Sequence, residues 1–255
     1  MNTGRFFSFR EQGDAEKPFL DHLADLRNMI IRMALVVVVA MSGAFAFRGF
    51  LSGLLQRPLV AVDPARASSL QSLGVADSMT ISIEISFYAG IIVSFPILMV
   101  LLAQFLFPAL KPSERKILLP VSLFGMILFT AGILFAYLVV LPGTLDFFFK
   151  DAKSMHWTPV WTVREYYSFT TQFLVAFGLA FEMPIVVLAL VKLGFLTSAK
   201  LRGARSVAIV AILTAAAFIA PSPDLFTYFL MAGPMVLLYE ACVWLARWVE
   251  PAAEG

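Results

Sequence analysis

Six apolar blocks, separated by polar segments, dominate this chain, at residues 29–47, 81–106, 117–141, 166–190, 206–220 and 225–245. A helix needs about 20 apolar residues to cross the ~30 Å hydrocarbon core of a bilayer. In lipid, only helices and closed barrels satisfy the backbone, and barrel strands are short and alternate in polarity. The pattern therefore predicts an all-α polytopic membrane protein with six transmembrane helices, which form a single integral membrane domain over residues 1–255.

The polar segments between the blocks have unequal lengths. Residues near 48–80 and 142–165 predict two long loops on one side of the membrane, where residues 221–224 form only a short turn. The last two helices look short, because residues 206–220 are 15 in number and Glu240 interrupts the final block after 15 residues, 225–239. At about 1.5 Å per residue, both fall short of the hydrocarbon core, so local thinning of the bilayer is expected.

The basic residues indicate the orientation of these helices. The chain is 60% hydrophobic and only 14% charged, with a net charge of +2. If the N-terminus is cytoplasmic, 13 of the 19 Lys and Arg residues fall on the cytoplasmic side and 6 on the opposite side. Since short cytoplasmic loops carry the excess of Lys and Arg, both termini are predicted inside, with residues 1–18 and 246–255 as cytoplasmic tails.

Glu182 is an ionisable residue inside the fourth apolar block, which holds no other charge. A carboxylate at this depth costs about 2.5–3.5 kcal/mol on insertion scales, so it must face protein or a wet cavity. Pro184 follows two residues later and weakens the helix at the same place. Two interpretations stay open: a functional contact, or a structural hydrogen bond to a neighbouring helix.

The other side chains do not indicate catalysis. Neither His22 nor His156 lies in an apolar block, Cys242 is the only cysteine, and no glycine-rich phosphate loop or metal-ligand cluster is visible. Intramembrane hydrolysis needs a nucleophile with a base, or paired carboxylates. We therefore expect a protein that is not an enzyme and that uses no cofactor, metal or nucleic acid.

Two further acidic residues look ordinary by themselves. Asp25 lies in an amphipathic segment, residues 19–27, that leads into the first apolar block and is typical of an interfacial helix. Glu114 lies in a basic turn beside Ser113, where helix capping would explain it. A solvated polar surface accounts for both residues.

Five motifs nevertheless occur in order along the chain. They are His22-Leu23-Ala24-Asp25-Leu26-Arg27, Phe105-Leu106-Phe107-Pro108-Ala109-Leu110 followed by Glu114-Arg115, Phe135-Ala136-Tyr137 through Pro142, Phe177-Gly178-Leu179-Ala180-Phe181-Glu182-Met183-Pro184, and Pro221-Ser222-Pro223-Asp224. With these motifs the chain resembles the TatC family, the multi-span receptor subunit of the twin-arginine protein translocase, from about Phe19 to Arg247.

The resemblance implies a function and a set of residues. It implies a concave, glove-like arrangement of six helices in the bacterial inner membrane, which binds twin-arginine signal peptides of folded proteins at the cytoplasmic face. It implies single-span TatA- or TatB-type partner subunits, contact with lipids, homo-oligomerisation, and transport driven by the proton-motive force. The residues carried over are Asp25, Glu114, Arg27 and Phe105 for signal-peptide binding, Glu182 facing the concavity, and Pro58, Tyr137, Asp224 and Tyr228 for structure or partner contact.

The chain departs from the family pattern at three positions. Asp25 stands where glutamate is usual, Met29 where a second basic residue often follows, and Tyr228 where a glutamine is often seen. Two competing functions also remain. One is a proton-coupled small-solute transporter that uses Glu182 as its proton carrier. The other is a structural scaffold for membrane subunits.

Overall fold

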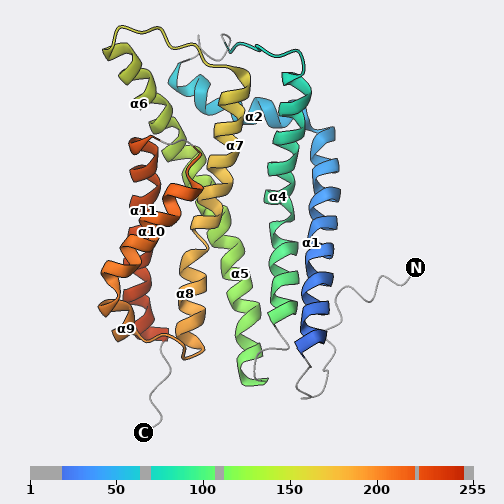
Figure 1. Cartoon of the computed structure of the whole chain (residues 1–255), viewed down its shortest axis with the longest axis vertical. Helices are drawn as coiled ribbons and strands as arrows, with labels where there is room; N and C mark the ends of the chain where they lie inside the picture. Colours follow the sequence, from blue (N-terminus) through green and yellow to red (C-terminus); the bar gives the residue numbers. More distant parts are fainter. Residues whose placement is uncertain (1–18, 64–69, 107–111, 222–223, 250–255) are drawn as a thin grey trace, which may run out of the picture.

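The computed structural model describes residues 19–63, 70–106, 112–221 and 224–249. Across these ranges the chain is helical, and extended pairing is limited to an isolated bridge between Gln71 and Thr162. The long helices run side by side in a bundle (Figure 1). Within the described residues, five helical stretches are long and apolar enough to cross a membrane. The prediction of an all-α polytopic membrane protein is confirmed.

The first helix, α1 (Phe19–Ala46), joins the amphipathic lead and the first apolar block without a break. A second helix, α2 (Arg48–Val62), follows directly and lies at the upper end of the bundle in Figure 1. The sequence predicted a loop at α2, because the segment lacks a long apolar block. α1 packs mainly against α4 (Asp77–Leu106), where a Cβ atom on Gly90 would lie 2.8 Å from the Met41 nitrogen.

The third apolar block forms part of a much longer helical stretch. α5 (Pro112–Phe135) continues through a π-helical turn, η3 (Ala136–Val140), into α6 (Leu141–Ser154). Pro142 has no N–H to donate to the carbonyl four residues earlier. A π-helical turn is one of the local adjustments by which a membrane helix accommodates a proline. The long loop predicted near 142–165 is therefore wrong for residues 142–154, which are helical.

The fourth apolar block is divided between α7 (Val163–Ala180) and α8 (Met183–Lys192). The break falls at Phe181 and Glu182, as Pro184 predicted. Proline cannot donate to the carbonyl four residues earlier and its ring crowds that carbonyl. For Pro184 this carbonyl belongs to Ala180, the last residue of α7.

The C-terminal part contains α9 (Ser198–Gly203), α10 (Arg205–Ile219) and α11 (Leu225–Val249). α10 has 15 residues, as predicted, and is shorter than the five candidate spans. The prediction of a short final helix is wrong, since α11 has 25 residues and continues through Glu240. Glu240 accepts a hydrogen bond of 2.8 Å from Arg205, so its charge is paired rather than disruptive.

α7 is the central helix of the bundle. Its side chains are largely buried, and it packs against both α4 and α5. Two glycines bring α5 and α7 close together: a Cβ on Gly132 would lie 2.8 Å from the Phe177 oxygen, and one on Gly178 would lie 2.7 Å from the Phe129 ring. This close contact fixes α7, and with it Glu182, relative to α4 and α5.

Candidate functional site

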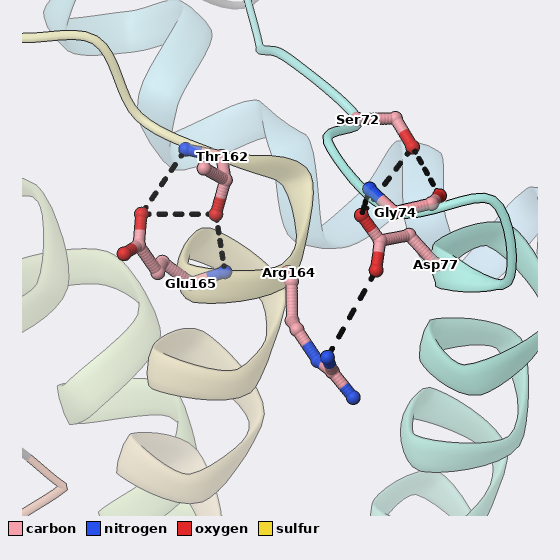
Figure 2. Close-up of polar contacts among 6 residues, drawn as sticks. All are labelled: Ser72, Gly74, Asp77, Thr162, Arg164 and Glu165. Atoms are coloured by element: carbon pink, nitrogen blue, oxygen red, sulfur yellow. Dashed lines mark hydrogen bonds and ion pairs between the residues drawn. The ribbon is translucent and has the colours of Figure 1, made fainter.

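We call the end of the bundle where α1 begins, α4 ends and α5 begins the inner end, and the opposite end the outer end. At the outer end, the segment that precedes α4 and the segment that precedes α7 are joined to each other (Figure 2). The Gln71 nitrogen donates to the Trp161 oxygen at 3.2 Å, and the Val163 nitrogen donates to the Gln71 oxygen at 2.9 Å. The starts of α4 and α7 are therefore held together.

Capping contacts complete this outer junction (Figure 2). Thr162 and Glu165 form a capping box at the start of α7, with the Glu165 nitrogen donating to the Thr162 hydroxyl at 3.1 Å. The buried Asp77 accepts a hydrogen bond of 2.7 Å from the Gly74 nitrogen and lies 4.0 Å from Arg164. Arg164 thus connects the first turn of α7 to the first turn of α4.

Three tyrosines attach α2 to the bundle at this end. Tyr137 donates to the Leu54 oxygen at 2.7 Å, Tyr166 to the Leu55 oxygen at 2.6 Å and Tyr167 to the Ser52 oxygen at 3.2 Å. Pro58, buried inside α2, has no N–H for the Leu54 carbonyl. Pro58 and Tyr137, both carried over by resemblance, are therefore linked through that carbonyl, which indicates a structural role for the pair.

Glu182 lies at the break between α7 and α8, where its backbone is helical but its side chain caps nothing. Its carboxylate points towards α5 and α4: a Cβ atom on Gly125 would lie 3.0 Å from Glu182 Oε2 and 2.9 Å from Met99 Cε. Glu182 Oε1 is buried and has no hydrogen-bond partner among the described residues. A buried polar atom without a partner is costly, so the hydrogen-bonding capacity of this carboxylate is not met within the described residues.

A second carboxylate, Glu84, lies in the seam between α4 and α7. It accepts a hydrogen bond from the Ser168 hydroxyl and a longer one, 3.5 Å, from Gln172 Nε2. No role for Glu84 was predicted from the sequence. Its partners come from α7, more than 80 positions along the chain, so no local pattern indicated them.

The inner end holds the residues predicted for signal-peptide binding. Asp25 and Arg27 lie in the second and third turns of α1, and Phe105 lies at the end of the neighbouring α4. Asp25 and Phe105 are half-buried and Arg27 is exposed. Glu114 belongs to the first turn of α5, but its side chain lies outside the described residues. The fold thus places the backbone of all four positions at one end of the bundle (Figure 1).

Asp224 and Tyr228 lie at the start of α11. The Thr227 nitrogen donates to Asp224 Oδ1 at 2.7 Å, which makes Asp224 the N-terminal cap of this helix. Tyr228 is half-buried and contacts the Phe229 ring edge-on, with centroids 5.0 Å apart. Part of the predicted turn, residues 222–223, lies outside the described residues.

No cluster of three or more His, Cys, Asp and Glu side chains that could hold a metal ion occurs in the described part of the chain. The one cysteine, Cys242, is buried.

Comparison with known proteins gives a consistent result. Residues 21–234 match the family model TatC, described as Sec-independent protein translocase protein. A Sec-independent protein translocase protein TatC of Akkermansia muciniphila is 40% identical over 84% of this chain, which spans 62% of that relative's length. The Campylobacter jejuni protein of the same name is 32% identical over 91% of this chain and 94% of its own.

Plant and structural relatives agree with these matches. A chloroplastic Sec-independent protein translocase protein of Pisum sativum is 31% identical over 92% of this chain and 65% of its own. A crystal structure of a twin arginine translocase receptor, TatC, superposes with a TM-score of 0.79 at 34% identity, and the match covers 89% of this chain and 99% of that one.

Proposed function

Because this chain belongs to the TatC family of Sec-independent protein translocase proteins, we propose that it is the receptor that binds twin-arginine signal peptides of folded proteins. It is a multi-pass membrane component of a protein translocase. One observation carries the receptor proposal: Asp25, Arg27, Phe105 and the first turn of α5 share the inner end of the bundle.

The chemistry of the inner end suits two guanidinium groups. The carboxylates of Asp25 and Glu114 belong to different helices, α1 and α5, so each accepts one arginine of the pair. Arginine–carboxylate contacts can be bidentate, which adds geometric selectivity over lysine. Phe105 offers an apolar surface beside them, where the apolar part of the signal peptide begins, and Arg27 limits the net negative charge of the patch.

Glu182 contacts the bound peptide or a partner helix further along its path. The carboxylate lies at the junction of α4, α5 and α8, and one of its oxygens has no partner among the described residues. We place this junction on the concave face of a glove-like bundle. A hydrogen-bond donor on an inserted helix would satisfy the free oxygen.

The wider proposal concerns topology and partners. Six helical segments cross the bacterial inner membrane: α1, α4, α5 with η3 and α6, α7 with α8, α10, and α11. α10 is the short one. Both termini face the cytoplasm. Residues 1–18 and 246–255 are then cytoplasmic tails of a single membrane domain. Single-span TatA- or TatB-type subunits and further copies of the chain assemble with it, and Asp224 and Tyr228 lie where α11 begins and such a helix can dock. The proton-motive force drives transport by the assembled complex.

Site-specific photocrosslinking tests the receptor proposal. A photoreactive residue at position 25, 114 or 182 is expected to crosslink to a twin-arginine precursor in membranes. Replacing Asp25 by Asn together with Glu114 by Gln should abolish capture while leaving the amount of folded protein unchanged. Normal capture by this double variant would refute the assignment of the patch.

The transporter alternative has little support. The relatives are protein translocase proteins, and Glu182 Oε1 has no hydrogen-bond partner among the described residues. A transporter would take up a solute in vesicles that hold this chain alone and lose uptake with Glu182→Gln. We expect no such uptake.

A further inference from the structure

We infer that Glu84, with Ser168 and Gln172, forms a second polar site, which binds the Lys or Arg side chain that follows the apolar helix of a bound signal peptide. The inference rests on the proposed receptor function. It concerns the outer half of the bundle, whereas recognition of the two arginines belongs to the inner end.

The first support is the organisation of the seam between α4 and α7. Both helices begin at the outer end and run in parallel (Figure 1). From the outer end inward, polar contacts join Asp77 to Arg164, and Glu84 to Ser168 and Gln172. Glu182, which follows α7, lies further in and beside Gly125 of α5. Glu84 and Glu182 therefore lie at different depths along α7.

The second support is the charge of Glu84. Its two hydrogen-bond partners, Ser168 and Gln172, are neutral donors, and none of the ion pairs among the described residues involves it. Arg164, one helical turn further out on α7, lies 4.0 Å from Asp77. A carboxylate inside a membrane helix is retained at considerable cost. A cation from another molecule would complete the site.

The third support is accessibility. Glu84, Ser168 and Gln172 are all half-buried rather than enclosed. Leu179, which follows Ser168 and Gln172 on the same face of α7 at spacings of i+11 and i+7, is 50% exposed. Residues at these spacings share one helix face. Val175 and Ala176, which lie between them, are buried, so the face is accessible at the level of Ser168 and Gln172 and again at Leu179.

The fourth support is length. Glu84 and Phe105 are 21 positions apart on α4, which at about 1.5 Å per residue is roughly 32 Å. A helix of about 20 apolar residues spans the same distance. A peptide whose arginines are held near Phe105 therefore brings the residue that follows its apolar helix to the level of Glu84.

Binding to the unaltered chain provides the test. Three peptides carry the twin arginines and the same 20-residue apolar helix, followed by Lys, Gln or Glu. The full-length chain in lipid nanodiscs should bind the Lys peptide about three- to tenfold more tightly than the Gln peptide, the range measured for polar contacts between membrane helices, and the Glu peptide least. Equal binding of the three peptides, with twin-arginine dependence intact, would overturn the inference and leave the receptor function standing.

Variants of the chain test whether the preference for the Lys peptide arises at Glu84. Glu84→Gln keeps an acceptor for Ser168 and should remove the preference for Lys, and Glu84→Lys should reverse it in favour of the Glu peptide. Glu240→Gln, which removes a carboxylate paired with Arg205 on other helices, is the matched control and should change nothing. A preference for Lys that survives Glu84→Gln would overturn the inference.

The source of the cation is tested separately. A photoreactive residue at position 83, where the native Ile is 43% exposed, should crosslink to the peptide at its outer end. Crosslinking to a partner subunit instead would overturn the assignment to the signal peptide. A chain that binds none of the peptides, with or without twin arginines, would refute both the receptor function and this site.

Discussion

Tyr137 donates a hydrogen bond of 2.7 Å to the Leu54 carbonyl, the acceptor that Pro58 leaves without a helical donor. The contact joins residues 83 positions apart and attaches α2 to the long helical stretch of α5, η3 and α6. With the hydroxyls of Tyr166 and Tyr167 it explains how a segment with two glycines and a proline is held as a helix at the outer end.

Tyr137→Phe is predicted to destabilise the protein by about 1 kcal/mol, because it leaves a partly buried carbonyl without a partner. In a Pro58→Ala background the helix regains an N–H for Leu54, so the same change should cost less. Thermal unfolding in detergent of the native chain, the two single variants and the double variant measures the coupling between Tyr137 and Pro58. Identical costs in both backgrounds would show that Tyr137 does not substitute for the missing donor.

Gly125→Ala is predicted to displace the Glu182 carboxylate, since the new methyl would lie 3.0 Å from Oε2 and 2.9 Å from Met99 Cε. Overpacking of this kind costs about 1–3 kcal/mol, and precursor transport should fall. Gly43→Ala is the matched control, because nothing lies within 4 Å of its Cβ position. Shortening Met99 to Ala in the same chain should restore part of the lost stability. Transport unaffected by Gly125→Ala would argue against a role for the position of Glu182.

Asp224→Ala is predicted to lower stability by about 1 kcal/mol through loss of the N-cap of α11, and Asp224→Asn by much less. Co-purification of partner subunits separates capping from a direct charged contact. If Asp224 acts only as a cap, the Asn variant retains its partners. Loss of partners in a stable Asn variant would assign the carboxylate to the interface.

The proposed topology predicts opposite labelling of two exposed positions. Cys242 is buried, so the native chain provides a silent background for single-cysteine variants. Trp157→Cys, between α6 and α7, should react with a membrane-impermeant thiol reagent from outside intact cells, whereas Phe195→Cys, after α8, should react only after lysis; the native side chains are 69% and 67% exposed. The reverse pattern would contradict cytoplasmic termini.

Much of the fold was predictable because apolar length is a local property. The blocks at residues 81–106 and 206–220 correspond closely to α4 and α10. The break at Glu182 followed from Pro184 for the same reason, since the effect of a proline on the preceding turn is short-range.

The remaining features depend on contacts that no local pattern contains. α2 is held by Tyr137, Tyr166 and Tyr167 from distant helices. Glu240 looked like the end of a span because its partner, Arg205, lies on another helix. The role of Glu84 was missed because Ser168 and Gln172 belong to α7. The grouping of Asp25 with Glu114 came only from family resemblance, as each is an ordinary surface charge by itself.

Recognition of the two arginines is measured by the affinity of the full-length chain for a twin-arginine peptide, compared with the same peptide carrying two lysines. We predict at least about tenfold weaker binding of the twin-lysine peptide, because hydrogen bonds to charged groups contribute about 1.5–3 kcal/mol. We also predict that Asp25→Asn with Glu114→Gln removes the difference. Equal affinity of the native chain for both peptides, or an undiminished difference in the double variant, would contradict recognition of the two arginines by these carboxylates.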